Sequence, residues 1–554
     1  MNIQPPRALC RRNPLKIITT LALVLALVTL IGLASLPVRA GSHTGASVVT
    51  VDTLNDESDS SCTDGDCSLR DAIAVAQAGD TIEFGVTGTI TLTIDQLTVD
   101  KNLAISGPGA GDLTISGDDT HRVFWINESV DATLSNLTIA DGQGQDGGGI
   151  FNRGGDLTLI GCTLTGNRST YDGGGVSNRF DGTLTVSNCL FSGNTARNGA
   201  AIDNRETLTV SGTTFTHNSA STWGGGIYNY QGIATITGST FTGNGELTDN
   251  GGAICNDRGT VQVTSSEFSA NEADLTGGAI YTGGDGGVLM VTGSGFDGNT
   301  TARGGGIHNA SLLTVINTTF SNNQVPLNGG GIHNTYVLTV TGSTFYSNTA
   351  QWGGGIENFY RLDLSSSTFS NNSVTDTGGG ICSHGALTVT NATPYTNTAG
   401  PQSGGINNNE GTLYVTNSTF VGNQAQTDGG AIRNGETTTL INTIVANSVA
   451  GGNCSGSALD AASTHGLSTD ATCSPGFAQT TNTALAMNWQ GWVFELITDS
   501  VAIDAGTNAG CPAADQLGQP RPQDGDENGT AVCDVGSFEL STLTEIVYLP
   551  LVLK

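Results

Sequence analysis

One unit of an internal repeat reads Gly-Gly-Val-Ser-Asn (174–178), then Thr-Leu-Thr-Val (183–186), then Cys-Leu-Phe-Ser-Gly-Asn (189–194). The unit occurs twelve times, each as a glycine run, an aliphatic anchor, a variable residue, usually Asn, a Leu/Val-rich segment and Phe-x-x-Asn. Successive anchors are 24 to 27 residues apart, and a fixed period in this range indicates stacked repeats. The anchors are Ile150, Val176, Ile202, Ile227, Ile254, Ile280, Ile307, Ile332, Ile356, Ile381, Ile406 and Ile432.

Each unit holds three short apolar segments separated by turn residues. The alternation in Leu184-Thr185-Val186 places Leu and Val on one face, as in a strand, and no segment of the repeat has a sustained helical period. Three strands in about 25 residues predict an all-β fold, a right-handed parallel β-helix whose coils pair at roughly 4.8 Å.

Asparagine recurs at two fixed places in the repeat, and stacked Asn side chains can bond to the coils above and below. The second residue after the anchor is Asn in ten units, with Thr282 and Ser383 as the exceptions. The last residue of Phe-x-x-Asn is Asn in all twelve: Asn167, Asn194, Asn218, Asn244, Asn271, Asn299, Asn323, Asn348, Asn372, Asn397, Asn423 and Asn447. Pro394 replaces the Phe of one unit and is expected to weaken that coil.

The repeat resembles that of the polymorphic outer-membrane proteins. A close match is Gly252-Ala253-Ile254 followed by Phe268-Ser269-Ala270-Asn271. This resemblance implies the β-helix architecture but no single function, because the same coil carries adhesins and polysaccharide-cleaving enzymes.

The N-terminal sequence pattern predicts an export signal. Basic residues precede an apolar run from Ile17 to Leu36, and Val38-Arg39-Ala40 offers a cleavage site; an uncleaved membrane anchor is the alternative. Residues 66–77 then form an amphipathic pattern with Ser68 as a helix cap, which suits a cover for the open end of a solenoid. Cys67-Ser68-Leu69-Arg70-Asp71-Ala72 resembles the CSLREA motif of exported repeat proteins, with Asp71 in place of Glu.

The repeat ends after Asn447, and the following sequence resembles a choice-of-anchor type Q domain. The resemblance rests on Ser500–Gly506, Asp515–Pro522 and Cys533–Glu539, and it implies attachment to a surface. The predicted domains are a signal peptide at 1–40, an N-terminal cap at 41–88, the β-helix at 89–450, an anchor-like domain at 451–540 and a tail at 541–554.

Net charge limits the possible partners, and cysteine content indicates the compartment. The net charge of −30 disfavours nucleic acid and anionic membranes, and no segment after the signal is predicted to span a bilayer. The cysteines fit an oxidising destination. Cys62–Cys67, Cys454–Cys473 and Cys511–Cys533 are plausible pairs, Cys162 and Cys189 lie within bridging range in successive coils, and Cys255 and Cys382 are expected to be free.

Two groups of residues are candidate sites. Asp524, Asp526 and Asn528 have the opening spacing of a calcium loop, although Val535 stands where an EF-hand has Glu; a turn-rich acidic loop is the alternative. If the anchor points inward, the variable residue after it points outward, so His308, His333 and Glu357 would form one exposed column. This column suits a metal or acid–base group, or exposed filler; parallel neighbours ligate a tetrahedral metal poorly unless a third side chain joins them.

The sequence favours a secreted or cell-surface scaffold, adhesin-like or structural, that binds a polysaccharide or neighbouring cell along an extended face, as a monomer without a required cofactor. The alternative is an extracellular polysaccharide lyase or glycoside hydrolase. That alternative requires clustered Asp calcium ligands beside a base, or paired carboxylates. No such convergent group is evident in the repeats, where Asp203 and Glu357 are predicted to lie roughly 29 Å apart. Aromatic residues that would stack on sugars are Trp223, Tyr228, Tyr230, Tyr281, Trp352 and Tyr360, with corner packing as their alternative role.

Overall fold

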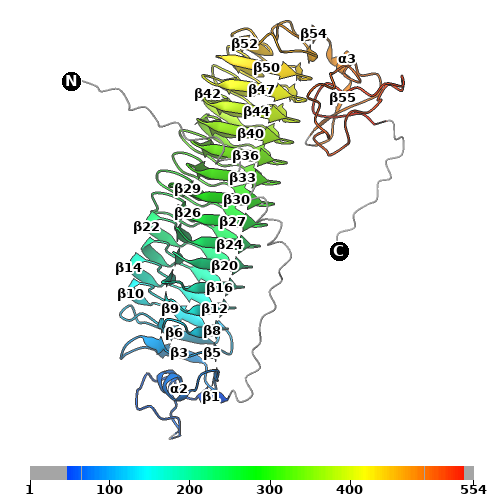
Figure 1. The fold of residues 1–554 in the computed structure, drawn as a ribbon. Helices are drawn as coiled ribbons and strands as arrows, with labels where there is room; N and C mark the ends of the chain where they lie inside the picture. Colours follow the sequence, from blue (N-terminus) through cyan, green and yellow to red (C-terminus); the bar gives the residue numbers. More distant parts are fainter. Residues whose placement is uncertain (1–46, 64, 492, 542–554) are drawn as a thin grey trace, which may run out of the picture. The chain divides into compact units, whose positions relative to one another are not determined.

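The computed structural model describes residues 47–63, 65–491 and 493–541. Most of the described residues form a right-handed parallel β-helix of about 16 turns with about 25 residues per coil (Figure 1). The predicted fold class is confirmed. The predicted signal, 1–40, and residues 542–554 of the predicted tail lie outside the described residues.

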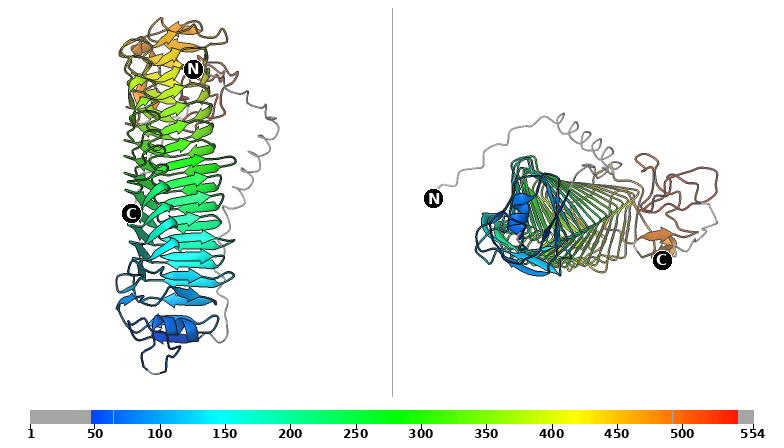
Figure 2. Two further views of the ribbon diagram at one scale, coloured as in Figure 1. Left: turned by 90° about the vertical axis from the view of Figure 1, so that its left-hand side faces the viewer. Right: turned by 90° about the horizontal axis from the view of Figure 1, so that it is seen from below.

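Three parallel sheets form the walls of the β-helix, and successive coils stack in register (Figure 2). Sheet A has 16 strands, from β1 (Val48–Val51) to β50 (Thr437–Ile441), and sheet C has 15, from β4 (Leu97–Val99) to β52 (Cys454–Gly456). Sheet B runs from β3 (Gly88–Thr91) to β54 (Phe477–Gln479). One coil consists of β15 (Val176–Arg179), β16 (Thr183–Ser187) and β17 (Leu190–Ser192), in sheets C, A and B.

The core is a set of apolar columns, as the alternation predicts. In sheet A, Leu184 pairs with Leu208 and Val186 with Val210 on the next coil, and these side chains are fully buried. In sheet B, rings from Phe191 to Phe369 stack at centroid distances of 4.5–5.0 Å. This continuous stack contributes both buried apolar area and ring contacts.

Both asparagine ladders are formed. The side-chain amide of each Phe-x-x-Asn residue from Asn167 to Asn397 donates to the next coil's Asn at 2.9–3.0 Å. In the other ladder, Thr282 and Ser383 accept the bond with their hydroxyl oxygens. The first ladder ends at Asn423, because Asn447 is exposed and its backbone N–H bonds to Thr469 instead.

The glycine run makes the turn that returns the chain to sheet C. Gly224 has φ +65°, and a Cβ there would lie 2.3 Å from the carbonyl oxygen of Ile227, so only glycine fits. The segment before this turn folds outward, and in the early coils it forms a fourth short sheet: β10 (Gln143–Asp146), β14 (Arg168–Asp172), β18 (Thr195–Asn198) and β22 (Ser219–Trp223). This outward segment lies against the outer face of sheet C, where the Trp223 ring is 5.3 Å from Tyr228.

The predicted cap helix is present as α2 (Leu69–Val75). Ser68 caps it by accepting a hydrogen bond from the Asp71 backbone N–H, as the sequence predicts. Arg70 pairs with Asp56 at 2.8 Å and donates to the carbonyl oxygen of Gln96, which ties the cap to the first coils.

The C-terminal segment folds back onto the last coils. It contains α3 (Asn482–Leu485) and a hairpin of β55 (Met487–Trp489) and β56 (Phe494–Leu496). Asn442 Nδ2 donates to the carbonyl oxygen of Thr507 at 2.9 Å, and the Ser537 N–H donates to Thr419 Oγ1 at 2.9 Å. These bonds connect it to coils more than sixty residues earlier in the chain.

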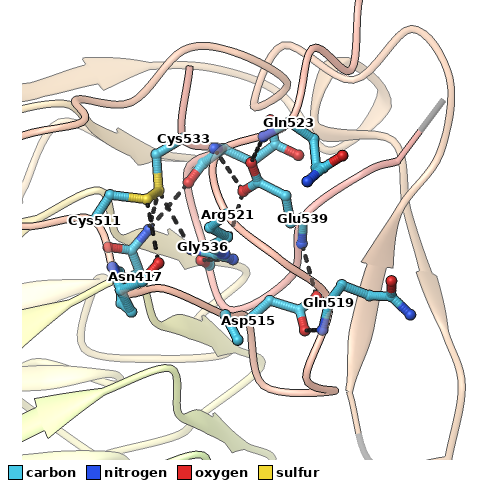
Figure 3. Close-up of polar contacts among 12 residues, drawn as sticks. Asn417, Cys511, Asp515, Gln519, Arg521, Gln523, Cys533, Gly536 and Glu539 are labelled. Atoms are coloured by element: carbon cyan, nitrogen blue, oxygen red, sulfur yellow. Dashed lines mark hydrogen bonds and ion pairs between the residues drawn. A yellow bond between two sulfur atoms is a disulfide. The ribbon is translucent and has the colours of Figure 1, made fainter. Parts of the chain in front are cut away.

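A buried ion pair organises this segment (Figure 3). Arg521 Nε lies 3.2 Å from Glu539 Oε2, and Arg521 also donates to the carbonyl oxygen of Gly536. The disulfide Cys511–Cys533 is beside them, and Asn417 of the β-helix donates to the Cys533 sulfur at 3.0 Å. Removing one partner of a buried pair typically costs about 3–5 kcal/mol, so this pair fixes one arrangement of the segment.

The disulfides Cys62–Cys67 and Cys454–Cys473 are also formed, and Cys255 and Cys382 are free, as predicted. Cys162 and Cys189 are free thiols in contact, because the Cys162 backbone N–H lies 3.4 Å from the Cys189 sulfur.

Candidate functional site

The column of variable residues is buried, so the prediction that His308, His333 and Glu357 are exposed is wrong. Their exposed fractions are 9, 5 and 1%. These side chains point away from the core but lie beneath the outward segments that precede the glycine runs. In the next coil of the same column, Thr377 Oγ1 of such a segment lies 3.6 Å from Cys382 Sγ. The variable column is therefore an enclosed layer between sheet C and its outward segments.

The structure brings Glu357 together with Cys382 and His384, two residues that sequence reasoning did not select for this site. Glu357 in β39 (Ile356–Asn358) is the register partner of Cys382 in β43 (Ile381–Ser383). His384 Nε2 lies 3.6 Å from Glu357 Oε1 and 3.7 Å from Cys382 Sγ. His333 approaches from the preceding coil, with Nδ1 3.8 Å from Glu357 Oε2. The overlooked signal is Cys-x-His, with His384 in the bend that follows β43 and its ring within 3.7 Å of Cys382 Sγ.

The three histidines of this layer differ in protonation. Burial lowers the pKa of His308 to about 4, and Arg303 adds repulsion; burial also lowers the pKa of His333 well below its usual range. The Cys382 thiol and the Glu357 carboxylate instead raise the pKa of His384 to about 10. The cluster around Glu357 thus combines a neutral imidazole with a strongly basic one.

A second cluster corrects the expectation that the repeats hold no convergent acidic group. Arg179 pairs with Asp146, Asp172 and Asp203, at 3.1, 2.5 and 3.2 Å. Arg205 pairs with Asp172 at 2.7 Å and Asp203 at 3.4 Å. These residues come from three successive coils. Asp146 and Asp172 lie in the outward segments of the first two coils, and Asp203 lies in sheet C of the third. Arg at the third position after the anchor in successive units was the available signal.

The charges of this second cluster are largely satisfied. Asp172 Oδ2 contacts both arginines and Oδ1 accepts a hydrogen bond from Asn198. Burial, together with Asp172, raises the pKa of Asp203 to about 6, although both arginines oppose the shift. Burial lowers the pKa of Arg205, but Asp203 and Asp172 outweigh it and raise that pKa overall, which keeps the guanidinium charged.

Exposed rings gather at the corner between sheets C and A, at the third and fourth positions after the anchor. Phe180, Tyr336 and Tyr360 are 57, 41 and 55% exposed, and Tyr336 and Tyr360 stack at 5.4 Å with nearly parallel rings. Ser311 and Gly385 hold the equivalent positions before and after this pair, so no neighbouring ring covers its outer faces. We call Phe180, Tyr230, Tyr336, Phe359 and Tyr360 the corner ridge.

Arginines accompany the corner ridge in its first half. The Arg153 guanidinium lies 5.8 Å from the Phe180 ring centroid, and Arg205 and Arg258 lie 5.2 and 5.7 Å from that of Tyr230. Of the aromatics proposed for sugar stacking, Tyr360 is exposed, Tyr228 is buried, and Trp223, Tyr230, Tyr281 and Trp352 are half-buried.

Asp524 and Asp526 lie together in the C-terminal segment, and Asp504 joins them with ligand atoms within 4.8 Å. The loop is closed by its own backbone: the Asn528 N–H donates to Asp524 and Asp526, and the Gly529 N–H donates to Asp524. The Asn528 amide donates to Asp526 rather than pointing its oxygen at the group. The calcium site at Asp524, Asp526 and Asn528 stays a prediction.

A pocket of about 450 Å³ lies away from these clusters, between the last coil and the C-terminal segment, and its lining includes Leu467, Phe477 and Val535. Within residues 47–63, 65–491 and 493–541, no helix has the length and apolar character needed to cross a bilayer.

Comparison with known proteins agrees with the fold. A family model described as a right handed beta helix region matches residues 84–268. The Chlamydia polymorphic membrane protein repeat matches residues 317–335, 366–384 and 417–435. No curated protein matches the chain.

Three solved structures are similar at low identity. A PL6 alginate lyase in complex with a trisaccharide is 12% identical, with 68% of this chain and 86% of that chain covered and a TM-score of 0.34. The catalytic unit of a GH87 alpha-1,3-glucanase from Streptomyces thermodiastaticus is 15% identical, with coverage of 75 and 70% and a TM-score of 0.30. Tailspike protein 3 of bacteriophage CBA120 is 11% identical, with coverage of 73 and 60% and a TM-score of 0.34.

Proposed function

We propose that this chain is an exported, surface-attached β-helix scaffold, adhesin-like in action, that binds a neutral polysaccharide along its corner ridge. The observation that carries the proposal is the set of exposed rings on one corner, with the outer faces of the Tyr336–Tyr360 pair uncovered by neighbouring rings. Such rings offer flat apolar faces on which sugar rings stack.

The arrangement suits many weak contacts to a repeating polymer. Phe180 and Tyr336 stand at the same repeat position six coils apart, roughly 29 Å along the axis at the usual strand spacing. A long chain that contacts both places gains affinity through effective concentration, while a short one does not. A monomeric rod is sufficient for this mode of binding.

Charge selects the kind of polymer. The net charge of −30 repels polyanions such as uronic acid polymers, whereas a neutral chain pays no such cost. The corner arginines at Phe180 and Tyr230 soften this repulsion locally, and their guanidinium groups are engaged with rings and carboxylates.

Export and surface attachment rest on three observations. The three disulfides suit an oxidising compartment. The N-terminal cap resembles the CSLREA motif, and the C-terminal segment resembles the choice-of-anchor type Q domain of surface proteins. The repeats matched by the polymorphic membrane protein family agree with this assignment.

A carbohydrate-active enzyme is the second candidate, and the Asp146–Asp172–Asp203 cluster beside two arginines favours it. A catalytic carboxylate must reach its substrate, but the Asp203 side chain is fully buried. A lyase also needs a neutral base, and the neighbouring aspartates raise the pKa of Arg205. We therefore assign this cluster a structural role and rank the binding scaffold first.

Affinity electrophoresis of the full chain in gels containing a neutral glucan or polygalacturonate tests the proposal. The neutral glucan is expected to retard the wild-type chain more than the polyanion does. Tyr336→Ala/Tyr360→Ala should weaken binding about tenfold, equivalent to roughly 1.4 kcal/mol. Tyr346→Ala/Tyr414→Ala is the matched control, because these tyrosines are similarly exposed, at 38 and 41%, but lie in sheets B and A. Equal retardation of both double variants would contradict the proposal.

A further inference from the structure

The cluster at Glu357, Cys382 and His384 has the composition of a transition-metal site. It offers one carboxylate oxygen, one sulfur and one imidazole nitrogen, and these atoms all lie within 4.8 Å of one another. Mixed oxygen, nitrogen and sulfur ligands are typical of Zn²⁺, whereas Ca²⁺ and Mg²⁺ prefer oxygen alone. The residue types therefore point to zinc chemistry.

The separations of the ligand atoms also fit zinc. Metal–ligand bonds of 2.0–2.3 Å in a tetrahedron place neighbouring ligand atoms about 3.3–3.7 Å apart. His384 Nε2 lies 3.6 Å from Glu357 Oε1 and 3.7 Å from Cys382 Sγ. Two edges of the tetrahedron thus exist with little or no movement of the side chains.

The β-helix itself produces this arrangement. In-register stacking sets Glu357 beside Cys382 on the adjacent coil. His384 stands just after the end of β43, two residues beyond Cys382, and its Nε2 lies 3.7 Å from Cys382 Sγ. Two parallel column neighbours would not surround an ion, but His384 enters from the corner and supplies the third direction.

Buried polar atoms without partners provide an independent indication. Among the described residues, neither Glu357 Oε2 nor His333 Nδ1 has a hydrogen-bond partner, and these side chains are 2 and 6% exposed. Leaving a buried carboxylate oxygen unsatisfied is costly, and a bound cation removes that cost. The two atoms face each other at 3.8 Å, so a small closure lets His333 hold the second oxygen of Glu357.

Neighbouring groups are suitably placed to orient the ligands. The Asn407 amide and the Thr377 hydroxyl both lie 3.6 Å from Cys382 Sγ, within reach of a thiolate. Asn409 lies 3.3 Å from His384 Nδ1. The amide atom nearest Nδ1 is Asn409 Nδ2, so a 180° rotation of this amide is needed for its oxygen to accept from Nδ1–H and leave Nε2 free for a metal.

Cys, His and Glu also occur together around nucleophilic thiols, but the burial of Cys382 from any substrate argues against that role. Cys382 is 1% exposed, with the outward segment of its own coil lying over it. A nucleophile must reach a substrate, while a metal ion needs only a narrow path and enclosing ligands.

We infer that Glu357, Cys382 and His384 bind one Zn²⁺ ion, with His333 positioning Glu357 and a fourth coordination place left for water. On binding, Cys382 Sγ–H and the His384 imidazolium each release a proton to solvent as their bonds to the metal form. The ion would join the coils of Glu357 and Cys382 directly beneath Phe359 of the corner ridge, whose ring stacks on His384 at 4.6 Å.

Metal titration of the full chain, stripped with a chelator and free of affinity tags, tests this site. Calorimetry with Zn²⁺ should give one tight equivalent for the wild type, and Cys382→Ser and His384→Gln should each weaken it at least 100-fold. Cys255→Ser is the matched control, because Cys255 is a buried free thiol in the same column without a neighbouring histidine. Loss of binding in Cys255→Ser equal to that in Cys382→Ser, or no binding by the wild type, would overturn the inference.

Cobalt provides a readout on the unaltered chain. Co²⁺ bound tetrahedrally with a thiolate gives visible d–d bands and a sulfur-to-cobalt charge-transfer band. The inference predicts both bands in the wild type and in Cys255→Ser, with the charge-transfer band absent in Cys382→Ser. Co²⁺ binding without that band in the wild type would contradict Cys382 as a ligand, whether or not the variants fold. Tyr336→Ala/Tyr360→Ala should bind Zn²⁺ normally, which separates this site from the polysaccharide proposal.

Discussion

Asn194 Nδ2 donates a hydrogen bond of 2.9 Å to Asn218 Oδ1 on the next coil. This relationship repeats from Asn167 to Asn423, so each buried amide satisfies its neighbour and also bonds to a backbone carbonyl oxygen, as Asn194 does to Leu164. The ladder converts a sequence period into a fixed register, because a one-residue slip would leave buried amides unpaired.

Asn271→Ala in the middle of this ladder should destabilise the chain by about 2–4 kcal/mol. The substitution leaves the Asn244 and Asn299 side chains and the carbonyl oxygen of Phe241 with lost partners in a dry core. Denaturant unfolding measures the change. Thr388→Ala on the exposed face of β44 (Ala386–Thr390) is the control and should stay within about 0.5 kcal/mol. An equal effect of both variants would refute the role of the ladder.

Pro394→Phe should stabilise the chain by about 1 kcal/mol, because it restores a ring beside Phe369 and a backbone N–H donor. On the far side of Pro394 the pairing is reduced: β45 (Thr393–Tyr395) and β48 (Thr419–Val421) share a single register pair, Tyr395 with Val421, whereas β48 and β51 (Ile444–Ala446) share three. Thermal unfolding checks this. A lower melting temperature of Pro394→Phe would contradict this prediction. It would show that the side chains around Pro394 pack against the proline and leave no room for a phenyl ring.

Acid should destabilise the wild type more than His308→Phe between pH 6.5 and 4. Burial and Arg303 hold the pKa of His308 at about 4, below its unfolded value of 6.5, so the unfolded state binds the proton first. Stability from the neutral ring is complete above pH 6.5 and decreases as pH falls through 4, by roughly 3 kcal/mol at most. Phe keeps the stack with Tyr281, whose ring lies 5.4 Å away, and removes the titration.

Melting temperatures of both chains across this pH range measure the difference. Arg303 faces His308 and is present in both chains. His333 lies beside His308, which helps to lower the pKa of His333, so part of the measured difference comes from the His333 ring. The exposed His465→Asn should follow the wild type. Parallel curves for the wild type and His308→Phe would contradict the prediction.

Calcium should raise the melting temperature if Asp504, Asp524 and Asp526 bind it, since carboxylate oxygens are its preferred ligands. Asp526→Asn should remove the calcium-dependent part of the stability, whereas Asp285→Asn in an exposed loop should not. Thermal unfolding with calcium or with a chelator distinguishes these outcomes. A melting temperature that is insensitive to calcium would identify this segment as a turn-rich acidic loop.

The sequence was sufficient for the architecture because every coil repeats the same local constraints. Gly224 makes a turn that only glycine can adopt, Phe241 packs in the core, and Asn244 bonds to the next coil. Each of these residues recurs once per repeat unit, so the period of the sequence predicts the sheets, the register and the buried columns.

The candidate site was harder to predict from the sequence, because it depends on which segments cover the outer face of sheet C. Alternation correctly directs Glu357 away from the core, but the fold of the outward segment decides that it is buried. Likewise, Asp172 and Asp203 share Arg179 only because the outward strand β14 lies beside sheet C. Outward segments pair in parallel from coil to coil, but their lengths and sequences vary, so the repeat pattern alone does not say which side chains they lay over sheet C.

The dependence of affinity on polymer length tests the central claim most directly. Calorimetry of the full chain with neutral glucan fragments, from a trisaccharide to chains that span roughly 29 Å, measures it. An extended binding face predicts that affinity rises at least tenfold with length, that Phe180→Ala removes this gain, and that no reducing ends appear during the titration. Affinity that is independent of length, or cleavage of the fragments, would contradict it.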